Sequence, residues 1–215
     1  MNIKILLGAA IAAFLFVGCS SPRFFVDSQW TNKPAKTKFI FSTGVVENQE
    51  DLDDVLVEDE NFTVWFARQL EENVKFYSNH VDFTAERISK EEMLEEKVTL
   101  GKNPVTVGKP KTFNSDAEIY VVLNNLWFGR TQRTSYYTHN IAAGTPTTSS
   151  TNYFISMSGR YAFYDTGTQK ILGYGEFNTN EEYVRNLGRD SWKRLIQTSI
   201  EEILENTPLT YPAAK

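Results

Sequence analysis

The chain has 215 residues, a formal net charge of −5 at neutral pH, 13% aromatic residues and one cysteine. This length suits a single domain with its own hydrophobic core. The mild acidity argues against a surface for nucleic acid or anionic lipid. A lone cysteine excludes an internal disulfide and a cysteine metal site, so packing must supply the stability.

The first 18 residues have the pattern of a secretory signal peptide. Lys4 precedes an uncharged run from Ile5 to Gly18, and Gly18 is the small residue that a cleavage site requires. The run is shorter than the roughly 20 apolar residues that a membrane-spanning helix needs. Removing residues 1–18 from the 215 leaves 197, and the loss of Lys4 changes the net charge from −5 to −6.

The residues Phe16-Val-Gly-Cys19 resemble the lipobox of bacterial lipoproteins, with Phe16 at the position where that family usually has leucine. The resemblance implies cleavage before Cys19 and acylation of its thiol, with palmitate among the attached chains. Ser20 follows the cysteine, where many lipoproteins retained in the inner membrane have aspartate, and this favours the outer membrane. A plain secretory peptide and an uncleaved anchor are the alternative interpretations.

The remaining chain divides into three predicted parts. We expect residues 19–37 to hold the lipidated cysteine and a short linker, part of it against the domain or the membrane surface. Residues 38–206 form a single domain, and 207–215 form a C-terminal tail. No internal repeat is visible.

The first half of the domain predicts a strand, a helix and a second strand. The apolar residues of 38–46 indicate the first strand, and an acidic run over 47–60 precedes an amphipathic helix that continues to Tyr77. The run lacks the glycine of a calcium-binding loop. Its carboxylates suit the positive end of a helix dipole instead. The second strand is expected over 81–85.

The segment that follows predicts a further short helix. Ser89 and Glu92 have the spacing of a capping box, so a helix is expected from there to about Lys97. The glycines and prolines of residues 100–113 predict irregular structure. The segment has no phosphate-binding loop, because neither of its Gly-Lys pairs is followed by Ser or Thr.

The second half predicts a three-stranded meander and a closing helix. Residues 117–128 are apolar on both faces, which is typical of a central strand, and 153–164 and 170–177 follow as antiparallel neighbours. A last helix is expected to begin at Asp190 or Ser191 and to pack on the sheet beside the first helix. The predicted class is α+β, a mixed or antiparallel sheet with two main amphipathic helices packed on it.

The sequence does not predict an enzyme. His80 and His139 lack the spacing of zinc ligands, and there is no G-x-S-x-G motif for a serine nucleophile. We therefore expect no catalytic residue, metal or cofactor.

The most unusual stretch is residues 129–151, which joins two strong strands where two to five residues would suffice. One interpretation is a partner-binding surface, since its tyrosines and arginines are residue types that are enriched at binding hot spots. The candidate residues are Arg130, Arg133, Tyr136, Tyr137 and His139. The other interpretation, which the sequence favours, is that the two strands continue outward as a solvated hairpin with a disordered Ser/Thr tip.

The order of elements and the turn Tyr164-Asp-Thr-Gly-Thr-Gln-Lys-Ile-Leu resemble a group of small envelope lipoproteins. The group includes curli-secretion and exopolysaccharide-export lipoproteins and activators of peptidoglycan synthases, whose domain is similar to the amino-terminal domain of TolB. The resemblance implies a periplasm-facing module that binds or assembles another envelope protein. A ligand- or glycan-binding lipoprotein is the second hypothesis and a hydrolase the third. The sequence assigns no oligomeric state.

Overall fold

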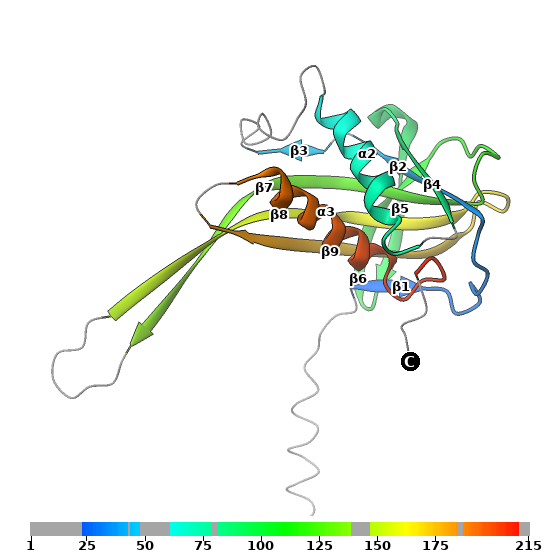
Figure 1. Ribbon diagram of the computed structural model, residues 1–215. Helices are drawn as coiled ribbons and strands as arrows, with labels where there is room; N and C mark the ends of the chain where they lie inside the picture. Colours follow the sequence, from blue (N-terminus) through cyan, green and yellow to red (C-terminus); the bar gives the residue numbers. More distant parts are fainter. Residues whose placement is uncertain are drawn as a thin grey trace, which may run out of the picture.

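The computed structural model describes residues 23–42, 44–47, 61–78, 81–138, 147–184 and 187–210. These residues form a seven-stranded mixed sheet with helices on one face and a β-hairpin on the other (Figure 1). The strand order is β1-β9-β8-β7-β2-β4, with β3 also paired to β7. The strands are β1 (Phe24–Val26), β2 (Lys36–Phe41), β3 (Val45–Val46), β4 (Asp82–Arg87), β7 (Ile119–Thr138), β8 (Thr147–Asp165) and β9 (Ile171–Tyr183).

The sheet combines a parallel part with an antiparallel part. β2 runs parallel to both β4 and β7. Helix α2 (Phe62–Val74) returns the chain between the parallel strands β2 and β4. β7, β8 and β9 form the predicted antiparallel meander. The α+β class with a mixed sheet is therefore confirmed.

The two helices lie side by side on one face of the sheet. Asn61 caps α2, since its Oδ1 accepts a hydrogen bond from the Val64 backbone N–H at 3.1 Å. α3 (Arg189–Leu204) packs beside α2, with the rings of Trp65 and Trp192 6.2 Å apart and edge to face. Both predicted helices and their packing are confirmed.

The opposite face of the sheet carries a hairpin that the sequence analysis missed. The capping box of Ser89 and Glu92 forms, but it begins only a short 3₁₀ turn (Lys90–Glu92). The chain then runs into β5 (Met93–Leu100) and β6 (Asn103–Pro110), so the predicted helix to Lys97 and the irregular segment 100–113 are both wrong. Pairing with β6 and burial against the sheet decided the outcome, because Leu100, Val105 and Val107 close a second core over Tyr120 and Tyr164.

The amino-terminal part differs from the prediction in two places. The strand predicted over 38–46 ends at Phe41, and only Val45–Val46 resume pairing as β3, where Val45 is 61% exposed. Residues 24–26, placed in the linker, pair with β9 as β1, and Trp30 packs in the core with its ring 5.2 Å from that of Phe163. The linker therefore contributes to the domain.

The predicted signal peptide, Cys19, most of the acidic run and the end of the tail lie outside the described residues. Among the residues that the structure does describe, no helix has the length and apolar character to cross a membrane.

Candidate functional site

The long segment between the second and third predicted strands forms part of a β-arm. β9 ends at Tyr183, which pairs with Tyr153, and beyond this pair β7 and β8 continue together. We call residues 133–138 and 147–152 the arm; in the described part of the chain they pair only with each other, from Arg133 opposite Asn152 to Thr138 opposite Thr147. Figure 1 shows the arm leaving the body of the sheet at one end. The predicted outward continuation of the two strands as a hairpin is confirmed, but residues 147–151, expected in a disordered tip, belong to the paired strand β8.

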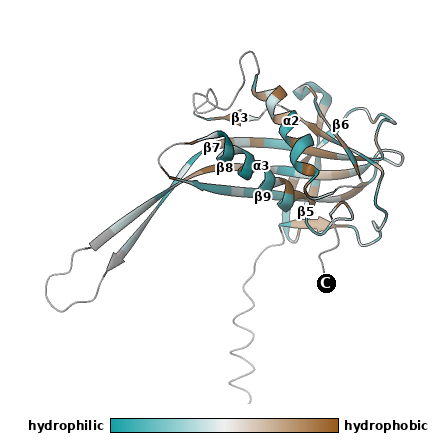
Figure 2. Ribbon diagram, viewed as in Figure 1, coloured by the Kyte–Doolittle hydropathy of each residue, from teal (hydrophilic) through white to brown (hydrophobic). Residues whose placement is uncertain are grey.

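The described side chains of the arm take part in neither hydrophobic core. Its strands consist largely of Thr, Ser and Tyr, and Figure 2 shows it without the brown that marks the apolar core strands. The hydroxyls of Thr134 and Thr151 make a cross-strand hydrogen bond of 3.1 Å. A two-stranded hairpin is marginally stable by itself in water. The arm forms here because it continues two strands that the core already holds in register.

A cavity of about 600 Å³ lies at the base of the arm, on the face of the sheet that carries the helices. The Arg130 guanidinium lies 6.0 Å from the centre of the Tyr183 ring, and the rings of Tyr153 and Tyr183 are 6.2 Å apart. Tyr153 is 49% exposed, so its ring is accessible from solvent. The lining residues are Arg130, Thr131, Gln132, Tyr153, Tyr183 and Leu187.

The predicted binding residues do not all share one surface. Side chains alternate along a strand, so Arg130 and Arg133, three positions apart on β7, point to opposite faces. Arg130 lines the cavity, whereas the Arg133 guanidinium lies 5.8 Å from the Phe154 ring on the other face. Tyr136 lies farther along the arm and is 73% exposed.

Two of the five residues are less fully described. Tyr137 belongs to β7, where it pairs with Thr148, but its side chain is outside the described part, and His139 lies wholly outside it. His80, the other histidine, also falls outside.

Sequence reasoning missed Tyr183 and Leu187. Tyr183 ends β9 in a polar stretch that carries no strong strand pattern, and Leu187 precedes α3. Only the pairing of Tyr183 with Tyr153 brings these residues to the base of the arm. The available signal was the alternation of Phe177, Thr179, Glu181 and Tyr183, which extends the last strand past its predicted end at Phe177.

A second, more polar cavity of about 440 Å³ lies on the other face, next to a bulge in β7. Asn125 has a φ of 51° at this bulge. Arg160 lines the cavity, but its guanidinium is already bound to Glu176 Oε1 at 2.9 Å and to the Thr106 carbonyl oxygen at 3.3 Å. These bonds connect β8, β9 and the hairpin, so Arg160 has a structural role.

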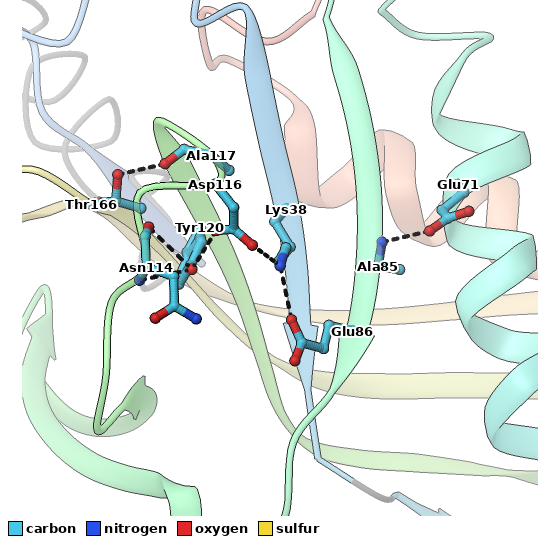
Figure 3. Close-up of polar contacts among 9 residues, drawn as sticks. All are labelled: Lys38, Glu71, Ala85, Glu86, Asn114, Asp116, Ala117, Tyr120 and Thr166. Carbon is cyan, nitrogen blue, oxygen red and sulfur yellow. Dashed lines mark hydrogen bonds and ion pairs between the residues drawn. The ribbon is translucent and has the colours of Figure 1, made fainter.

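An ionic cluster around Lys38 lies at the other end of the sheet (Figure 3). Lys38 Nζ donates to Glu86 Oε2 at 2.8 Å and also to Asp116 Oδ2, and the Tyr120 hydroxyl donates to Asp116 Oδ1 at 2.8 Å. Burial lowers the pKa of Lys38, but the hydrogen bonds to Asp116 and Glu86 outweigh it, so the pKa lies above its ordinary 10.5. The hydrogen bond from Lys38 holds the pKa of Asp116 below its ordinary 3.8. An acid–base catalyst works best with a pKa near the working pH. Both pKa values are shifted further from neutral pH, so Lys38 and Asp116 stay charged over a wider pH range.

Comparisons with known proteins do not assign a family. No family model and no curated protein matches the chain. Among solved structures, a neuraminyllactose-binding hemagglutinin homologue from Helicobacter pylori is similar over 83% of this chain and 82% of its own, with 6% sequence identity and a TM-score of 0.32. A likeness this weak establishes neither a shared fold nor a shared function.

Proposed function

We propose that this chain is an outer-membrane lipoprotein, anchored by acylated Cys19, whose periplasm-facing domain is a non-catalytic module that binds another envelope protein through the arm. The observation that carries the proposal is the arm itself. It extends β7 and β8 past the last β9 pair, Tyr153 with Tyr183, into solvent. A partner that covered it would stabilise a hairpin that is marginal alone.

The arm offers two kinds of contact to a protein. The outer edges of its two strands carry backbone donors and acceptors that no third strand pairs in the described part, and such edges accept an extended segment of a partner. Tyr136 adds a large exposed ring, and Arg133 a guanidinium. Tyrosine and arginine are among the residues enriched where alanine substitution costs the most binding energy.

Site-specific photocrosslinking in cells tests the proposal. A photoreactive phenylalanine analogue at Tyr136 should give a defined adduct with one envelope protein, identified by mass. The matched control is Phe76, which is 70% exposed just beyond α2 and far from the arm in the sequence. Tyr136→Ala should weaken the binding of that partner by roughly 30-fold, since a hot-spot side chain contributes about 2 kcal/mol. Absence of an adduct at 136, or the same adduct at 76, would contradict the proposal.

The cavity at the base of the arm favours a second candidate, a glycan-binding lipoprotein. Tyr153 and Tyr183 present aromatic surface beside Arg130 and Gln132, so one wall can stack on a sugar ring while polar groups meet its hydroxyls. The same experiment separates the two functions. The photoreactive residue at Tyr183 would then crosslink to cell-wall glycan, with no protein adduct at Tyr136.

A further inference from the structure

The outer edge of β1 carries two exposed aromatic side chains next to each other in the chain. β1 pairs with β9 on one side only and is the end strand of the sheet (Figure 1). Phe24 is 41% exposed and Phe25 is 44% exposed. Adjacent side chains on a strand point to opposite faces, so the two rings flank the edge of the sheet.

The position of β1 in the chain fixes how far it can lie from a lipid on Cys19. Only residues 20–22 separate Cys19 from Arg23, where the described structure begins. An extended chain over these four steps reaches at most about 14 Å. The polar layer of each leaflet is about 5–8 Å thick, since the whole bilayer measures about 40–45 Å and its hydrocarbon about 30 Å. A domain tethered at Cys19 therefore holds β1 at the membrane surface.

Packing contacts on both faces hold β1 against the rest of the domain. The Phe25 ring lies 5.1 Å from that of Tyr174, whose hydroxyl donates to the Thr99 carbonyl oxygen at 3.1 Å and so connects to the β5–β6 hairpin. On the other face Val26 packs against the main core. Phe25 therefore cannot turn inward without breaking these contacts.

Two carboxylates near this edge have guanidinium partners. Glu202 lies 3.9 Å from the guanidinium of Arg23, and Glu176 is bound by Arg160 at 2.9 Å. The edge therefore presents aromatic rings beside paired charges. Phe side chains on a membrane-surface element enter the boundary between headgroups and acyl chains, and the apolar area that they bury contributes to binding without anionic lipid, so this pattern suits zwitterionic lipid.

We propose that β1 is a membrane-contact edge: Phe24 and Phe25 insert among the headgroups of the leaflet that holds the acyl chains of Cys19. The proposal depends on the lipid anchor that the proposed function includes. It goes beyond that function because it gives the domain a fixed orientation, with the β1 end of the sheet against the bilayer.

A fluorescent label at position 25 tests the contact. Cys19 is the chain's only cysteine and is consumed by acylation, so in acylated Phe25→Cys the introduced thiol is the single site for an environment-sensitive dye. In phosphatidylcholine vesicles the dye should shift to the blue, and headgroup-level spin-labelled lipid should quench it at least twofold. The control, acylated Phe76→Cys, should show neither effect. Equal quenching at the two positions would overturn the proposal.

Three further measurements separate the ways in which the experiment can fail. If the wild-type protein purified from cells and Cys19→Ser float equally poorly with vesicles, the anchor is refuted and with it the proposed localisation. If the acylated protein floats while the dye at position 25 stays in water, only the membrane-contact edge is refuted. Phe24→Cys must repeat the Phe25→Cys result, which guards against a local folding defect. A dye signal that depends on protein density instead of lipid would identify a second copy as the occupant and also overturn the proposal.

Discussion

Lys38 shows how one side chain connects three segments of the chain. It lies on β2, its side chain is 12% exposed, and it binds Glu86 on β4 and Asp116 just before β7. The two carboxylates are 50% and 43% exposed, so water screens the ion pairs and each contributes modestly. Together they connect the parallel edge of the sheet to the loop that enters β7.

Lys38→Met should lower the free energy of unfolding by about 1 kcal/mol at neutral pH, because it leaves Asp116 without its charged partner. The pKa of Asp116 is depressed in the folded state, so its stabilising effect is present above its ordinary pKa of 3.8 and is lost as the pH falls through the folded value. The pKa of Lys38 is raised, so its effect is present below 10.5 and is lost above. Urea unfolding across pH should therefore show a difference in the free energy of unfolding between the wild type and Lys38→Met, and this difference should vanish at both low and high pH.

The matched control for this prediction is Lys36→Met, two positions earlier on the same strand and exposed. It should leave the free energy of unfolding within about 0.5 kcal/mol of the wild type. A gap for Lys38→Met that stays constant down to pH 2 would show that the ion pairs do not stabilise the fold.

The described residues of the arm belong to neither core, so we expect the rest of the fold to form without it. Replacing residues 134–151 with Asn-Gly would join Arg133 to Asn152, which are already paired, through a turn that suits a two-residue hairpin. The free energy of unfolding should change by less than about 1 kcal/mol, since no core contact is lost. Thermal unfolding followed by circular dichroism measures this. Phe128→Ala, in the fully buried core, should cost about 3–5 kcal/mol by comparison. A comparable loss on removing the arm would mean that the arm supports the core.

The elements that the sequence predicted correctly have long periodic patterns. Helix α2, helix α3 and the β7–β9 meander each bury a face whose spacing is visible in the residues. The β5–β6 hairpin was missed because its signals are non-local. Ser89 and Glu92 form a real capping box, and Met93–Leu100 contains helix-forming Glu, Leu and Lys, so local preference favoured a helix. Tertiary pairing with β6 decided otherwise.

The candidate site was predictable in part for the same reason. The unusual length and composition of residues 129–151 drew attention to the arm. The separation of Arg130 from Arg133 follows from strand alternation once β7 is known to extend that far. Tyr183 reaches the cavity only through the register of β9 against β8, and no local pattern contains that register.

At the scale of the whole molecule, the sheet has a hydrophobic core on each of its two faces. The helices cover one face with a core that includes Trp65, Val121 and Phe163, and the hairpin covers part of the other through Val107 and Tyr164. Tyr164 also donates a hydrogen bond of 3.0 Å to the Gly108 carbonyl oxygen, which fixes the hairpin to the sheet. Both cores consist of residues between Val26 and Leu209, so we expect the domain to fold without the lipid on Cys19.

Cys19→Ser should therefore change location without changing the fold. The variant should move from the membrane fraction to the soluble periplasmic fraction, because stable attachment needs the acyl chains that serine at position 19 does not receive. Labelled palmitate should enter the wild type and not the variant, and thermal unfolding of the two folded domains should coincide. Equal incorporation of label into both chains would refute the lipid anchor.

The continuity of β7 has a mechanical consequence. Beyond its bulge at Asn125 the strand continues from the core into the arm, and the arm reaches about 20 Å beyond the last β9 pair, at roughly 3.3 Å per residue over six residues. A partner that pulls along the arm loads many ladder hydrogen bonds in shear at the same time. A sideways pull that separates the two strands instead breaks them one by one. The arm is therefore stiff along its length and weak to peeling, so the direction of a load decides whether it reaches the core.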